Sequence, residues 1–121
     1  MLPKVNILTM LTDEEIYETI KQITNKYKLF ECQACADEIK KWLQENNISA
    51  TYIKLVAHHS DFIISKRVGY HQSITLNGIH YGIEIKGTVF DNLPNTGLSK
   101  QAWLNDFESL HDITIEESKI E

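Results

Sequence analysis

The first third of the chain carries apolar residues at intervals of three and four, the spacing of one face of an α-helix. The segment Thr12-Asp13-Glu14-Glu15 has the form of a capping box, and the apolar side chains after it keep helical spacing: Ile16, Ile20, Ile23 and Tyr27. This pattern predicts an amphipathic helix over about residues 13–27. A second helix is predicted from near Cys32 to Glu45-Asn46-Asn47, with an apolar face of Ala36, Ile39 and Leu43.

After the second helix the apolar pattern changes to a period of two, which indicates β-strands. Residues 50–56 are predicted to form a strand, and residues 57–70 a loop with a candidate edge strand at 62–64. Three strands joined by tight turns follow at 73–76, 79–85 and 88–91, and they predict an antiparallel meander. The last predicted elements are a loop at 92–98, a short helix capped by Ser99, a strand at 112–116 and a polar tail.

The order of these elements predicts an α+β fold in which N-terminal helices pack on an antiparallel sheet. At 121 residues the chain can build one hydrophobic core. No repeat or linker is apparent, so residues 1–121 are predicted to form a single domain. Apolar residues make up 42% of the chain and charged residues 24%, as in soluble globular proteins.

Charge and hydropathy exclude several classes of partner. The net charge of -5 and the single arginine, Arg67, argue against unaided nucleic-acid binding, because neutralising phosphates requires clustered Lys and Arg. No apolar run approaches the roughly 18 residues of a membrane span. Residues 1–11 hold one Lys and a short apolar patch, so no signal peptide is predicted. We therefore expect a protein made in the cytoplasm, with no membrane or nucleic-acid partner.

Three residues, Cys32, His80 and Asp91, form the candidate catalytic set. A thiol attacks as thiolate, and a helix N-terminus beside an imidazolium favours that form. Cys32 stands at the predicted start of the second helix, and His80 opens a strand. Asp91 lies one strand further on, so a hairpin turning near Gly87 places Asp91 and His80 at the same end of adjacent strands. We expect His80 to activate Cys32, and Asp91 to orient the imidazole.

Each of these residues alone is more often a core or turn residue, but their joint spacing favours catalysis. The second cysteine, Cys35, is kept as an alternative nucleophile, and His71 as a reserve base. The Cys-x-x-Cys spacing also allows a local disulfide, a redox pair or half a metal site. A thioredoxin-like motif is disfavoured because residues 27–31 make a poor central strand. Zinc is disfavoured because His58-His59 lack the usual ligand spacing.

We therefore predict no metal and no cofactor, and we take Cys32 to be a free thiol, which implies a reducing compartment. Residues 58–69 are rich in polar groups, with only Phe62, Ile63 and Ile64 offering apolar area. This composition predicts a mobile surface loop outside the core that borders the active site and gates substrate.

The residues around the candidate set resemble a known family. Cys32, Ala36 and Ala50 are similar to the cysteine helix of transglutaminase-like and papain-like domains, and this register favours Cys32 over Cys35 as nucleophile. Two positions depart from the papain pattern: Asn47 replaces a Gly, and Lys26 stands where papain has Gln. The second half resembles papain-fold toxin domains of bacterial polymorphic toxin systems in Asn77, Gly78, His80, Tyr81, Ile83, Ile85, Gly87, Val89, Phe90, Asp91, Asn92, Gly97 and Trp103.

The resemblance covers about residues 28–108 and implies a papain-like fold and a toxin or effector. It also implies a protein substrate in a target cell, delivery into that cell's cytoplasm and a cognate immunity protein. Attack by Cys32 on an acyl carbon would suit a protease, a deamidase or an acyltransferase, because all three pass through a thioester. The alternative is a non-catalytic acidic interaction protein, such as an immunity protein, in which Cys32 and His80 are structural.

Overall fold

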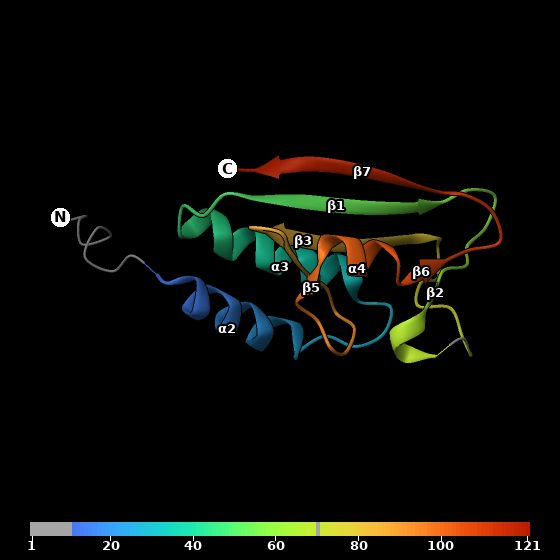
Figure 1. Ribbon diagram of the computed structural model, residues 1–121, viewed down its shortest axis with the longest axis horizontal. Helices are drawn as coiled ribbons and strands as arrows, with labels where there is room; N and C mark the ends of the chain where they lie inside the picture. The colour runs from blue at the N-terminus through green and yellow to red at the C-terminus, as the bar shows by residue number, and fades with distance from the viewer. Residues whose placement is uncertain (1–10, 70) are drawn as a thin grey trace.

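Two N-terminal helices lead into an antiparallel sheet in the computed structural model, which describes residues 11–69 and 71–121. Helix α2 spans Asp13–Thr24 and helix α3 spans Cys32–Glu45 (Figure 1). The predicted capping box is confirmed: the Thr12 hydroxyl accepts from the Glu15 amide, and the Glu15 carboxylate accepts from the Thr12 amide. Helix α2 ends at Thr24, three residues before the predicted end. Within the described ranges, no helix is long and apolar enough to cross a membrane.

The main sheet has five strands in the order β5-β4-β3-β1-β7. Their bounds are β1 Ala50–Ala57, β3 Ile79–Ile85, β4 Thr88–Phe90, β5 Leu98–Ser99 and β7 Ile113–Ile120. Every pairing is antiparallel, which confirms the predicted α+β fold. Strand β7 is longer than the predicted strand at 112–116 and takes up most of the predicted polar tail, because it pairs with β1 along its whole length.

The predicted strand at 73–76 is wrong. Ile74 makes one backbone hydrogen bond, to the carbonyl of Ile63, and the hydroxyl of Ser73 bonds to the carbonyls of Ile63 and Thr75. Hydroxyl groups that bond to nearby backbone compete with a strand ladder. Strand β1, far away in sequence, takes the place beside β3.

The prediction that residues 58–69 lie outside the core is also wrong. Ile63 is fully buried in a core cluster with Ile53 and Trp103. Strand β2 (Ile64–Ser65) pairs with β6 (Phe107–Glu108) in a second, two-stranded sheet, and a 3-10 helix follows at Lys66–Val68. Ser65 and Arg67 of this segment bond to Asp106 inside the protein.

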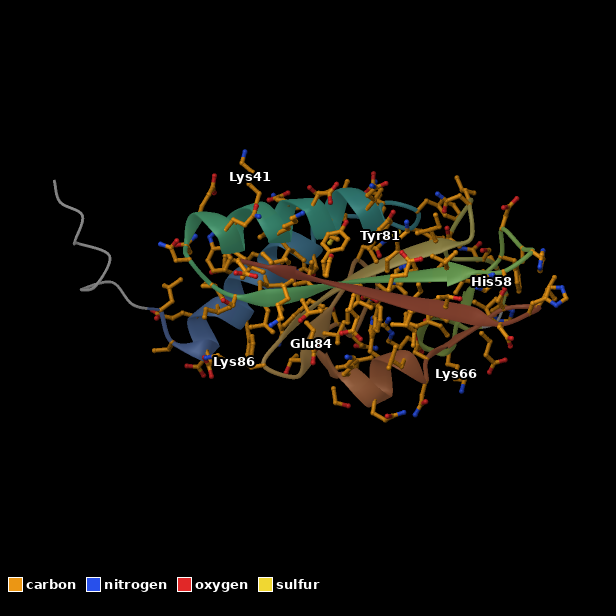
Figure 2. The ribbon with its side chains drawn as sticks, turned by 90° about the horizontal axis from the view of Figure 1, so that it is seen from above. Lys41, His58, Lys66, Tyr81, Glu84 and Lys86 are labelled. Atoms are coloured by element: carbon orange, nitrogen blue, oxygen red, sulfur yellow. The ribbon has the colours of Figure 1, made fainter. Side chains whose placement is uncertain are left out.

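The main sheet is covered on both faces. Tyr81 and Ile83 of β3 pack with α2 and α3 in one core cluster. On the other face lie the segment around Ile63 and the short helix α4 (Lys100–Leu104), which Ser99 caps as predicted. Figure 2 shows Tyr81 on the α3 side of β3 and Glu84 on the α4 side. Because side chains alternate along a strand, His80 shares the face of Glu84 and reaches the second cluster.

Candidate active site

Cys32 is the first residue of α3, where the amides of the opening turn have no partner inside the helix. Its thiol donates to the carbonyl of Ile79 at 3.7 Å, so the sulfur lies next to the start of β3. No side chain caps the helix: the carboxylate of Glu31 instead accepts from the Lys28 amide at 2.6 Å. This leaves the first-turn N–H groups free to meet an oxygen atom beside the thiol.

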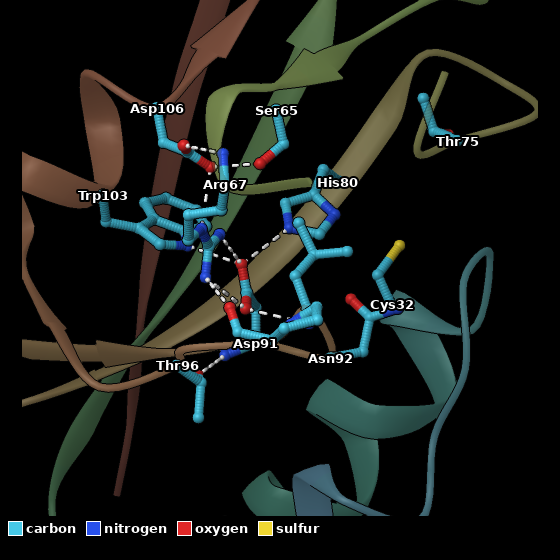
Figure 3. Close-up of polar contacts among 12 residues, drawn as sticks. Cys32, Ser65, Arg67, Thr75, His80, Asp91, Asn92, Thr96, Trp103 and Asp106 are labelled. Carbon is cyan, nitrogen blue, oxygen red and sulfur yellow. Dashed lines mark hydrogen bonds and ion pairs between the residues drawn. The ribbon is translucent and has the colours of Figure 1, made fainter. Parts of the chain in front are cut away.

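His80 lies fully buried between Cys32 and Asp91. Its Nε2 atom is 3.1 Å from the Asp91 carboxylate, and Figure 3 shows the other ring nitrogen on the side where the Cys32 sulfur lies. Burial alone would lower the pKa of His80. The hydrogen bond to Asp91 and the nearby Cys32 thiol together outweigh burial and raise this pKa to about 9. The imidazole therefore holds its proton at neutral pH, between a carboxylate and a thiol.

The Asp91 carboxylate is fully buried and accepts five hydrogen bonds. The donors are His80 Nε2, Trp103 Nε1, two guanidinium nitrogens of Arg67 and the Leu93 amide. Burial alone would raise the pKa of Asp91, but the contacts with His80 and then Arg67 hold it well below its ordinary value. Asp91 is therefore a carboxylate anion whose orientation is fixed from several sides.

Arg67 is a site residue that the sequence analysis missed. Its guanidinium bridges two buried carboxylates, with Nη2 at 2.7 Å from Asp91 and Nε at 2.8 Å from Asp106. Asp106 also accepts from the Arg67 amide and from the Ser65 hydroxyl (Figure 3). The sequence signal was weak: Arg67 is the only arginine, but it stands among polar residues that are typical of a solvated loop.

Trp103 and Phe107 enclose the His80 imidazole, with ring centroids 5.9 Å and 4.9 Å away. Trp103 is fully buried in the core, and it donates its indole N–H to Asp91 at 2.7 Å. This approach requires Gly82, because a Cβ at that position would lie 2.6 Å from the Trp103 ring. The aromatic rings keep water away from the His80–Asp91 pair.

The structure also shows where the alternative nucleophile, Cys35, and the reserve base, His71, lie. Cys35 lies one turn further along α3 and is almost fully buried. Burial, then the charges of Asp91 and Cys32, raise the pKa of its thiol to about 12, which makes it a poor nucleophile. Both cysteines are free thiols. His71 is exposed, with its ring against Gly69, and no hydrogen bond in the described residues joins it to Cys32 or Asp91.

Asn92 is a second residue whose contacts the sequence did not reveal. Its side-chain amide nitrogen donates at 2.8 Å to the carbonyl of Lys28, in the turn before Cys32. Its side-chain oxygen is buried without a partner. Asn92 also lines a cavity of about 470 Å³, together with Leu29, Val68 and Leu93.

We expect the free energy of unfolding to fall as the pH rises from about 6.5 to about 9. His80 binds its proton more tightly in the folded protein, because its pKa is raised from 6.5 to about 9. The stabilisation is complete below the lower value and is lost as the pH passes the upper one. Urea denaturation at several pH values measures this fall. In His80→Gln the free energy of unfolding should fall less over this pH range. The same pH dependence in both proteins would contradict a raised pKa for His80.

Comparison with known proteins identifies the family to which the chain belongs. A family model described as papain fold toxin 2 matches residues 15–108, which include most of α2, all the candidate residues and strand β6. The match extends the resemblance seen in the sequence by thirteen residues toward the N-terminus. No curated protein and no solved structure matches the chain.

Among the described residues, no group of three or more His, Cys, Asp or Glu side chains could hold a metal ion.

Proposed function

This chain belongs to the papain fold toxin 2 family, and on that premise we propose that it is a toxin whose Cys32 thiol attacks an acyl or amide carbon. The observation that carries the proposal is the fully buried imidazole of His80. It bonds to Asp91 through one nitrogen, its other nitrogen lies on the side of the Cys32 sulfur, and its pKa is raised to about 9. A proton held between a thiol and a fixed carboxylate is the arrangement that nucleophilic acyl transfer needs.

The reaction proceeds in two steps. The reactive form is the Cys32 thiolate beside protonated His80, reached when the thiol gives its proton to the imidazole. The sulfur then bonds to the carbonyl carbon and the carbon–nitrogen bond breaks, while protonated His80 gives its proton to the departing nitrogen. Neutral His80 then takes a proton from the incoming water or amine, which attacks the thioester and releases Cys32 as the thiolate. Asp91 orients the imidazole and stabilises its charged form throughout. The free amides at the start of α3 can stabilise the negative oxygen in both steps.

The substrate is proposed to be a protein in the cytoplasm of a target cell into which the toxin is delivered. A cognate immunity protein is proposed to protect the producing cell. The net charge of -5 suits a basic inhibitor surface. The second candidate nucleophile, Cys35, is disfavoured by its burial and raised pKa.

Mass spectrometry of a bacterial proteome tests the proposal and identifies the bond that is attacked. Cells that express the wild-type chain are compared with cells that express Cys32→Ala at the same level. We expect one protein or a few to differ between the two proteomes. New peptide termini indicate a protease, conversion of Gln to Glu indicates a deamidase, and new isopeptide links or acylated side chains indicate an acyltransferase.

Identical proteomes would contradict the proposed catalytic function and favour the interaction protein. A Cys35→Ala chain serves as the control for the loss of a thiol from the same helix. It should produce the same modified peptides as the wild type, because burial raises the pKa of the Cys35 thiol to about 12 and makes it a poor nucleophile.

A further inference from the structure

Two buried side-chain atoms in the described part of the chain have no hydrogen-bond partner: Nδ1 of His80 and Oδ1 of Asn92. Both belong to the candidate active site, and Figure 3 shows Asn92 on the same side of His80 as Cys32. An unpaired buried acceptor destabilises the folded state, and native proteins keep few of them. The Cys32 sulfur lies on the side of the His80 nitrogen, whereas no group among the described residues bonds to the Asn92 oxygen.

The orientation of the Asn92 amide follows from its neighbour. The Lys28 carbonyl is an acceptor, so only the NH₂ group of Asn92 can face it at 2.8 Å. The same carbonyl accepts from the Glu31 amide, which fixes the turn that leads into Cys32. The Asn92 oxygen is therefore held as an acceptor that cannot exchange places with the nitrogen. It adjoins Asp91 in sequence and the cysteine turn in space.

We propose that Asn92 Oδ1 accepts a hydrogen bond from the N–H of the substrate's amide group, so that the site selects amides that carry an N–H. This inference rests on the proposed attack by Cys32 and narrows its substrate class. Primary carboxamides and secondary peptide amides provide this donor, whereas esters, thioesters and tertiary amides do not. A site built to bond a substrate N–H discriminates against analogues without it, because its own polar group then stays unpaired.

Three alkylating amides test the inference, since they differ mainly in the number of N–H groups. The probes are iodoacetamide, its N-methyl derivative and its N,N-dimethyl derivative, with two, one and no N–H. Peptide mass spectrometry gives the alkylation rate at Cys32, and each rate is divided by the rate with glutathione. For the wild type we expect the first two ratios to be similar and the third to be about tenfold lower, or ~1.4 kcal/mol.

In Asn92→Ala we expect the three ratios to converge. Asn46→Ala is the matched control, because Asn46 also donates its side-chain amide to a backbone carbonyl, that of Trp42, at the other end of α3. This control should keep the wild-type preference. Near-UV circular dichroism checks that both variants are folded, and the wild-type series decides the question if Asn92→Ala does not fold.

Equal ratios for the three probes in the wild type would overturn the proposal, as would a preference that persists in folded Asn92→Ala. These results leave the reactivity of Cys32 intact, so they do not touch the proposed function. Failure of all three probes to label Cys32 would instead overturn the nucleophilic role of this thiol, and the role of Asn92 with it.

Discussion

Asp91→Ala is expected to lower the free energy of unfolding by about 3–5 kcal/mol, the cost of removing one partner from a buried ion pair. The substitution leaves the Arg67 guanidinium facing Asp106 alone and leaves Nε2 of His80 without an acceptor. It also removes the acceptor of the buried Trp103 indole. Because these donors converge on one carboxylate, no neighbouring group can replace it.

Urea denaturation followed by tryptophan fluorescence measures this loss. Asp112→Ala is the matched control, since Asp112 is exposed and such substitutions usually change stability by less than about 0.5 kcal/mol. If Asp91→Ala were no less stable than Asp112→Ala, the charged network around Arg67 would not contribute to the fold as described.

Local rules explain what could be predicted from the sequence. The capping box at Thr12 and the cap at Ser99 depend on residues three positions away, and both are formed. The hairpin of β3 and β4 depends on a short turn at Gly87, and it brings His80 and Asp91 within 3.1 Å of each other. The papain-fold resemblance read from these same residues is confirmed by the family match.

Long-range pairing explains what could not be predicted. The period-two pattern identified β1 and β3 as strands, but it does not show which segment pairs with β3. The partner is β1 rather than residues 73–76. Ile63 enters the core because β2 pairs with β6, more than forty residues further along the chain. Neither contact can be read from the local sequence pattern, because the pairing of strands depends on side-chain packing in the folded sheet.

Buried polar residues were the hardest to predict. Arg67 and Asp106 each look like surface residues until they are seen together with Asp91, since a charge is buried only where its counter-charge is also present. The same holds for Asn92, whose partner is a backbone carbonyl that no side-chain pattern records. Composition therefore predicted a mobile loop where the structure has a buried ion-pair network.

The most direct test of the central claim is a growth assay that compares wild-type protein with Cys32→Ala, each expressed in the cytoplasm of a bacterium. Wild-type protein should stop growth. Cys32→Ala at an equal level should not, because loss of a nucleophile typically lowers turnover by about 10⁴-fold or more. The fold should survive, since the thiol's one hydrogen bond is the weak 3.7 Å contact with Ile79. Circular dichroism of the purified variant checks this.

Cys35→Ala provides the control within the same assay. Its thiol is buried and its pKa is raised to about 12, so this variant should inhibit growth as the wild type does. The account predicts full inhibition by Cys35→Ala and none by folded Cys32→Ala. Inhibition by Cys32→Ala equal to that of the wild type would contradict it and would favour a protein that acts by binding alone.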